Sequence, residues 1–106
     1  MITVTSDLIP GKKIVKTFGM VRGNTIRARH VGRDIMAGFR ALVGGEIMEY
    51  TKLMAEAREQ AIDRMKQEAE RMGANAVVGL RFTTSVIMGG AAELLSYGTA
   101  VYIEEE

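Results

Sequence analysis

Apolar and polar residues alternate along the first part of the chain with the period of a β-strand. The alternation begins at Ile2 to Thr5, and a turn is expected at Pro10-Gly11, a common pair in type II turns. From Ile14 to Val21 the chain is rich in β-branched and aromatic residues, which favour a strand. Two strands joined by a turn are therefore predicted at the start of the chain.

The pair Gly23-Asn24 interrupts this second strand. Both residues tolerate positive φ, so the pair indicates a tight turn or a bulge. Extended structure resumes over residues 25–31, where Arg27 and Arg29 share one face because side chains alternate across a strand.

The spacing of apolar residues then changes to that of a helix. Ile35, Phe39 and Leu42 recur at i, i+4 and i+7, the spacing of one helical face. Asp34 favours the start of this short helix, and Gly44-Gly45 favours its end.

A longer helix is predicted from about Ile47 to Met72. Its apolar residues repeat at helical spacing: Tyr50, Met54, Ala57, Ala61, Met65, Ala69 and Met72. Arg71 in the last turn and Gly73 directly after it are typical of a helix end. Because alanines dominate the apolar stripe, this helix is expected to pack close to a sheet.

The last third of the chain predicts a β-hairpin. In its first strand the even-numbered residues from Ala76 to Val86 are expected on one face. Met88-Gly89-Gly90 predicts the turn, and Glu93 to Ile103 the closing strand. The ending, Glu104 to Glu106, is expected to be a solvated tail.

This order, β-β-α-α-β-β, predicts a single α+β domain over residues 1–106, with a mostly antiparallel sheet covered on one face by the long helix. The second face of the sheet is expected to carry small and aromatic residues: Gly19, Gly79, Ile87, Ala91, Ala92, Tyr97, Gly98 and Tyr102. Such a face is typical of contact with another subunit, so an oligomer is expected.

Composition narrows the function classes. The chain has 106 residues, a formal net charge of +1 and no Cys, which removes disulfides, thiolate metal sites and Cys nucleophiles. No apolar run approaches the roughly 20 residues that span a bilayer, and the first residues do not follow the pattern of a secretory signal. A cytoplasmic protein without a membrane partner is expected.

Three stretches resemble the YbjQ-like family, which is labelled as a heavy-metal-binding domain. They are HVGRDIMAGFRALVGGEIMEYTKLMAEAREQA from His30, RMGANAVVGLRF from Arg71 and AAELLSYGTAV from Ala91. The resemblance covers essentially the whole chain. It implies a small cytoplasmic protein that assembles as a closed homo-oligomeric ring, expected to be a pentamer, and it brings no established activity or catalytic residue.

A metal site is one interpretation of the residues in these stretches. His30 is the only imidazole, and Asp34, Glu46 and Glu93 are the candidate carboxylates. A divalent metal needs about four ligands, which one subunit supplies poorly, but a ring would bring several copies of His30 together. The alternative is that His30 is an interface residue hydrogen-bonded to Asp34.

An anion site is a second interpretation. Basic side chains gather around the predicted start of the short helix: Arg22, Arg27, Arg29, His30 and Arg33. Backbone amides there would add partial positive charge, and arginine binds phosphate or carboxylate bidentately. The alternative is that these arginines pair with Glu46, Glu49 or Glu93, within one chain or across an interface.

Other activities find little support. Aromatic content is 6%, and no aromatics are interleaved with the basic residues in the way that RNA-binding sheets require. There is no GxSxG or P-loop spacing, so no enzyme and no nucleic-acid partner are predicted. The expected function is that of an oligomeric module that binds a metal ion or a small anion, the alternative being a structural or partner-binding scaffold.

Overall fold

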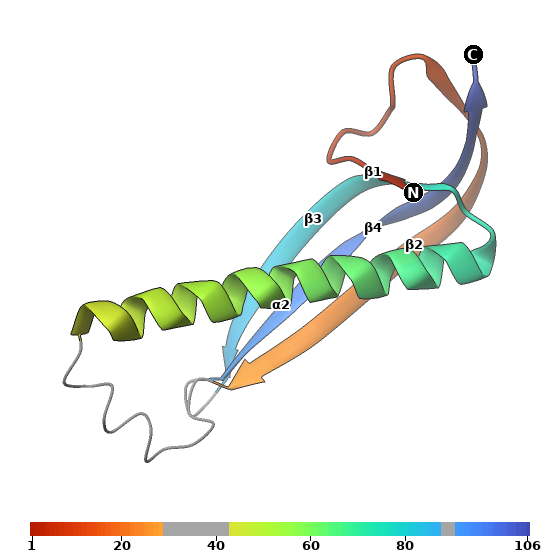
Figure 1. The fold of residues 1–106 in the computed structure, drawn as a ribbon. Coiled ribbons are helices and arrows are strands. Elements are labelled where there is room, and N and C mark those ends of the chain that lie inside the picture. The colour runs from red at the N-terminus through yellow and green to blue at the C-terminus, as the bar shows by residue number, and fades with distance from the viewer. Residues whose placement is uncertain (29–42, 88–90) are drawn as a thin grey trace.

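Four strands and one long helix make up the described part of the chain (Figure 1). The computed structural model describes residues 1–28, 43–87 and 91–106. The elements are β1 (Ile2–Thr3), β2 (Lys12–Ala28), α2 (Val43–Met72), β3 (Ala76–Ile87) and β4 (Ala91–Glu105). The predicted short helix at 35–42 and the predicted turn at 88–90 lie outside the described residues. The α+β class is confirmed, with α2 lying across one face of the sheet.

The sheet is mixed, which corrects the expectation of a mostly antiparallel sheet. Its strand order is β1-β3-β4-β2, and β4 is antiparallel to both of its neighbours. The short strand β1, in contrast, is parallel to β3, with Ile2 opposite Ala76. The reason is that the segment after β1 crosses the sheet face away from the helix before β2 begins, so β1 and β2 lie at opposite edges.

Strand β2 runs without a turn through Gly23-Asn24, so the predicted turn or bulge there is wrong. Gly23 pairs with Ser96 and Asn24 with Leu95 in unbroken register. Glycine is needed here for a different reason, because a Cβ at Gly23 would lie 2.2 Å from the backbone oxygen of Ala61 in α2. The residue marks a close approach of helix and strand.

Helix α2 confirms the prediction of a long helix close to a sheet. The alanines of its stripe and one methionine are fully buried: Ala57, Ala61, Met65 and Ala69. The helix ends at Met72, and Gly73 follows with φ +94°, a conformation typical of a helix C-terminus. Within the described residues, no helix combines the length and the apolar character that crossing a membrane requires.

A bulge at Gly79 divides β3 between the two faces of the sheet. Gly79 has φ +65°, and the register with β4 shifts around it. Val77 and Leu80 therefore both pack on the helix side, whereas Ala76 and Val78 belong to a second cluster on the other face. The expectation of simple even–odd alternation along this strand is wrong because of that extra residue.

The second face of the sheet is partly covered by the chain's own first residues. Val4, Ile9 and Ile14 pack there against a buried cluster made of Ala76, Val78, Val101 and Ile103. The small residues expected on this face are distributed differently. Ala92 and Gly98 are buried in the same alternating set as Ser96, which bonds to α2, so they lie on the helix side and the expectation that they lie on the second face is wrong. Gly79 lies next to Asp7 of the N-terminal segment.

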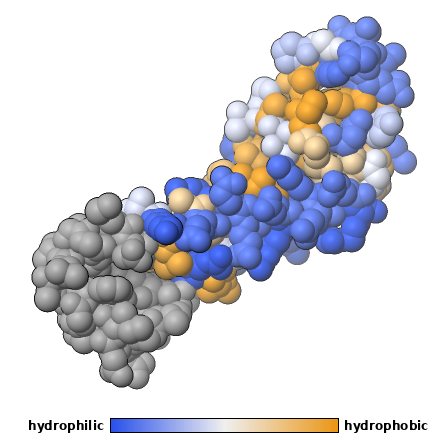
Figure 2. All heavy atoms as spheres, viewed as in Figure 1, coloured by the Kyte–Doolittle hydropathy of each residue, from blue (hydrophilic) through white to orange (hydrophobic). Residues whose placement is uncertain are grey.

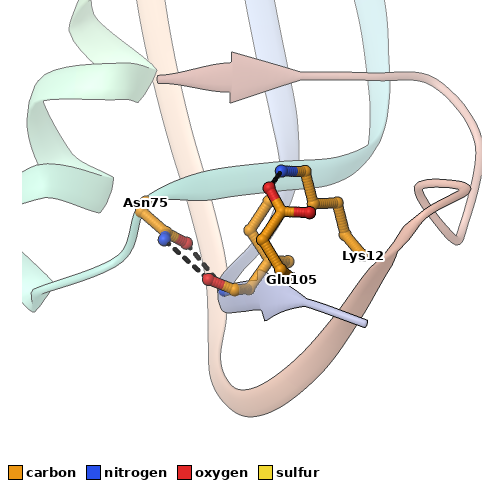
Figure 3. A network of polar contacts seen from close by, with 4 residues as sticks. Lys12, Asn75 and Glu105 are labelled. Atoms are coloured by element: carbon orange, nitrogen blue, oxygen red, sulfur yellow. Dashed lines mark hydrogen bonds and ion pairs between the residues drawn. The ribbon is translucent and has the colours of Figure 1, made fainter.

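The glutamates near the end of the chain are not simply a tail, as had been expected. Glu104 and Glu105 are part of β4, and the Glu105 carboxylate forms an ion pair with Lys12 (Figure 3). Beside it, the Asn75 side chain donates to the Ile103 carbonyl at 2.9 Å and accepts from the Ile103 amide at 2.7 Å. These contacts join β2, β4 and the segment that links α2 to β3.

Candidate functional site

Arg27, one of the predicted anion ligands, is held by the helix. It lies near the end of β2, and one guanidinium nitrogen donates to Gln60 Oε1 of α2 at 2.6 Å. The other terminal nitrogen, at 3.4 Å, donates to the carbonyl oxygen of Ile26. The partner is therefore an amide, and not one of the carboxylates considered from the sequence. Whether Arg27 also binds an anion stays a prediction.

Two further candidates, Arg22 of β2 and Glu93 of β4, lie within the described residues. The Arg22 amide donates to Glu68 Oε1 at 3.0 Å, and Glu93 Oε2 accepts from Asn24 Nδ2 at 3.2 Å. The described partner of Glu93 is therefore an amide, and not one of the arginines considered from the sequence.

The side chains of the other candidates for the anion and metal sites are outside the description. Arg29, His30, Arg33 and Asp34 lie outside the described residues. Glu46 lies in the first turns of α2, and only its backbone is described. That these residues form one site stays a prediction.

A heavy-metal centre finds no ready ligand set in the described residues. Over 1–28, 43–87 and 91–106, no three or more His, Cys, Asp or Glu side chains are grouped closely enough to hold an ion. The whole chain contains no Cys, the soft ligand that heavy metals prefer. The described residues alone do not fit such a metal.

A row of polar side chains along α2 does form a defined arrangement at the outer edge of β2. Gln60 binds Arg27, Arg64 donates to the carbonyl oxygen of Asn24 at 2.6 Å, and Glu68 accepts from the amide of Arg22 at 3.0 Å. The row was not predicted from the sequence. The sequence nevertheless contains a pattern that could have indicated it. These residues recur every four positions, and each directly precedes a buried residue of the apolar stripe.

Two buried hydroxyl groups attach the sheet to the helix backbone. Thr25 Oγ1 donates to the Ala57 carbonyl at 3.1 Å, and Ser96 Oγ donates to the Ala61 carbonyl at 2.8 Å. Both residues are essentially inaccessible to solvent. Because buried hydroxyls need partners, these bonds satisfy the two side chains and fix the position of α2 along the sheet.

The described residues line two shallow grooves beside the helix. One lies at the β2 edge and is lined by Met20, Arg22, Glu68 and Met72. The other lies between α2 and β3 and is lined by Ala55, Glu56, Arg58, Glu59, Ile62 and Phe82. The second groove is lined by both apolar and charged side chains.

Comparison with known proteins identifies the family. A family model described as "Putative heavy-metal-binding" matches residues 1–104. A UPF0145 protein from Methanosarcina acetivorans is 61% identical over 97% of both chains. A second, from Archaeoglobus fulgidus, is 54% identical over 95% of this chain and 94% of its own.

A solved structure supports the fold alone. It is the crystal structure of a protein of unknown function from Pediococcus pentosaceus, assigned to the DUF74 family. The TM-score is 0.55 at 18% identity, with 98% of each chain covered. Taken together, the match over residues 1–104 and the identity of more than half with full-length relatives show that the chain belongs to the YbjQ family of UPF0145 proteins.

Proposed function

We propose that this protein is the subunit of a closed homo-oligomer that serves as a cytoplasmic scaffold, with five copies as the family resemblance implies. The observation that carries the proposal is the exposed apolar surface of β2. Within the described residues, 65% of the surface of Met20 and 59% of the surface of Ile26 are exposed. Large exposed apolar side chains on one strand favour burial against another copy.

The shape of the chain supports the same proposal. The radius of gyration is 17.5 Å, with extents of 57 × 21 × 17 Å. A compact domain of this length has a radius of gyration of about 13 Å. An elongated subunit keeps much of its apolar surface accessible, and association would bury that surface.

The outer side of the helix is not the surface for association. Figure 2 shows the outer surface of α2 as largely hydrophilic. Its exposed residues include Arg58, Asp63, Gln67 and Glu70. We therefore assign association to the sheet and its edges.

The test is native mass spectrometry of the untagged protein, together with the variant Ile26→Lys. A single oligomeric mass is expected for the unmodified chain. Ile26→Lys should dissociate it, because lysine ammonium groups would be placed in an apolar contact. The matched control is Leu8→Lys, which changes a residue that is 71% exposed in the N-terminal segment. A monomer at micromolar concentration of the unmodified protein would overturn the proposal.

Metal binding is the second candidate, and the family description is the observation that favours it. In a ring, His30 from each copy would supply the ligands that one chain lacks, with Asp34 and Glu46 as further candidates. The test is elemental analysis and metal titration of the intact oligomer and of His30→Ala. Stoichiometric zinc or copper that is lost in the variant would support a site. Unchanged metal content in His30→Ala would exclude this residue as a ligand.

A further inference from the structure

The groove at the β2 edge combines two thioethers with one positive and one negative charge. Strand β2 contributes Met20 and Arg22, which lie two positions apart, and α2 contributes Glu68 and Met72, which lie four positions apart. Residues at these spacings are neighbours on one face of a strand and on one face of a helix. Each element therefore supplies one methionine and one charged residue to the same groove.

The two elements run in opposite directions along this groove. The Arg22 amide donates to Glu68 Oε1 at 3.0 Å, and the carbonyl oxygen of Asn24, further along β2, accepts from Arg64 at 2.6 Å. Later residues of β2 thus lie beside earlier residues of α2. Arg22 and Glu68 meet at one end of the groove, which leaves the two methionines at the other end.

The groove has apolar surface and a cation that the described residues do not use. Met20 is 65% exposed, and Met72 is 39% exposed. Glu68 is bound through the backbone amide of Arg22, and the guanidinium group of Arg22 has no hydrogen-bond or ion-pair partner in the part of the chain that the structure describes. A partner for this surface should therefore supply apolar contacts and a carboxylate.

The groove lies far from the points at which the description of the chain is interrupted. Those points are Ala28, Val43, Ile87 and Ala91. Figure 1 shows the end of β2, the start of α2 and the end of β3 at one end of the molecule, and the C-terminal end of α2 at the other. At 1.5 Å per residue, the stretch of α2 from Val43 to Glu68 is roughly 37 Å long.

The lining of the groove is complementary to a second copy of itself. When two grooves face each other across a two-fold axis that runs along the groove, the strand side of each lies over the helix side of the other. Arg22 of each copy then meets Glu68 of the other copy, and methionine meets methionine. Such self-complementarity is what an isologous contact requires. The contact gives both guanidinium groups a carboxylate and buries the exposed thioethers.

We infer that the groove lined by Met20, Arg22, Glu68 and Met72 is an isologous contact between two copies of this chain. The inference rests on the proposed closed ring and deepens it. Five subunits of one ring cannot pair two by two among themselves, so the contact joins two rings into an assembly of ten copies. One such contact is small, but two rings form five of them at once, and linked contacts strengthen each other.

The test is native mass spectrometry of the unmodified protein and of two charge reversals, Arg22→Glu and Glu68→Lys, over a dilution series. The unmodified protein should show ten copies. Each variant places like charges opposite each other across the two-fold axis, so the concentration at which two rings separate should rise by at least about tenfold. The matched controls Arg58→Glu and Glu70→Lys reverse exposed charges on the outer side of α2 and should leave this concentration unchanged.

Mixing the two variants gives a second readout that a loss of stability cannot imitate. When a ring of Arg22→Glu faces a ring of Glu68→Lys, every contact between positions 22 and 68 joins opposite charges again. Equal amounts of the two variants should therefore combine into assemblies that carry five copies of each. Glu68→Lys also removes the acceptor of the Arg22 amide, whereas Glu68→Gln keeps an acceptor oxygen. Glu68→Gln should weaken the pairing of rings through the loss of charge alone.

The outcomes separate this inference from the proposed function. Single rings of the unmodified protein would overturn the inference and leave the proposed function in place. An assembly of ten copies that separates no more readily in the charge reversals than in their controls, or variants that do not combine on mixing, would do the same. A monomeric unmodified protein would overturn both.

Discussion

Gly23 of β2 and Ala61 of α2 are in direct backbone contact. A Cβ built on Gly23 would lie 2.2 Å from the Ala61 oxygen and 2.4 Å from the Met65 nitrogen. Both of these atoms belong to the helix backbone, which cannot move locally as a side chain can. The distance between helix and sheet is therefore set by the missing side chain at this position.

Replacing Gly23 with alanine is expected to destabilise the protein by about 3 kcal/mol, because the whole helix must shift to admit a methyl group. Urea unfolding followed by circular dichroism measures the effect. Asn24→Ala is the control. In the described chain only glycines have positive φ, so the backbone at Asn24 is one that alanine also adopts. The control should therefore cost less than about 1 kcal/mol. Similar losses in the two variants would show that the close approach of α2 to Gly23 does not determine the cost of the substitution.

Removing the buried hydroxyls should loosen the attachment of α2. Thr25→Val and Ser96→Ala are each expected to lower the free energy of unfolding by about 1 kcal/mol, because each loses a hydrogen bond to a helix carbonyl. The exposed Thr17 provides the control, and Thr17→Val should change stability by less than about 0.5 kcal/mol. Chemical denaturation measures the free energy of unfolding of each variant. If Thr25→Val and Ser96→Ala change it no more than Thr17→Val does, the two hydroxyl groups do not stabilise the attachment of α2 to the sheet.

Glu68 should protect a single backbone amide at the β2 edge. In Glu68→Ala the Arg22 amide loses its acceptor, so its hydrogen exchange with solvent should become about tenfold faster. Glu68→Gln keeps an acceptor oxygen and should preserve most of the protection. NMR hydrogen exchange resolves this amide from its neighbours. Equal exchange rates in Glu68→Ala and the unmodified protein would show that the carboxylate does not close the edge.

Asn75 and Lys12 form neighbouring contacts that should differ in their energetic weight. Asn75→Ala leaves the amide and the carbonyl of Ile103 without their partner and is expected to cost about 2 kcal/mol. Lys12→Met breaks only the ion pair with the exposed Glu105 and should cost less than about 1 kcal/mol. Thermal denaturation shows which of the two variants loses more stability. A larger loss in Lys12→Met than in Asn75→Ala would contradict the prediction.

The long helix could be predicted because its signal is local. Ala57, Ala61 and Ala69 repeat at helical spacing, and Gly73 stops the helix where a positive φ is needed. The predicted start at Ile47 is wrong, because the helix begins at Val43 and continues through Gly44-Gly45. Glycine only weakens the propensity for a helix, and tertiary interactions can override that preference.

Positions at which glycine serves packing could not be recognised from the sequence. Gly23 resembles a turn residue, and its true reason is a helix far away in the chain. Gly79 resembles an ordinary strand residue, yet it forms the bulge that moves Leu80 to the helix side. In both cases the deciding contact is tertiary. The candidate site could be predicted even less well from the sequence. The helix residue that binds Arg27, Gln60, was not among the partners considered for it.

The pairing of β2 with β4 has a consequence for how fast the chain folds. Its nearest partners in sequence are Ala28 and Ala91, and its most distant are Lys12 and Glu105. Every hydrogen bond of this ladder therefore closes a loop that contains the entire helix and β3. Such a high contact order predicts slow folding, with β3 and β4 associating early and β2 adding last. In refolding experiments, Gly23→Ala should then accelerate unfolding more than it slows folding, because the strand that carries Gly23 is added after the transition state.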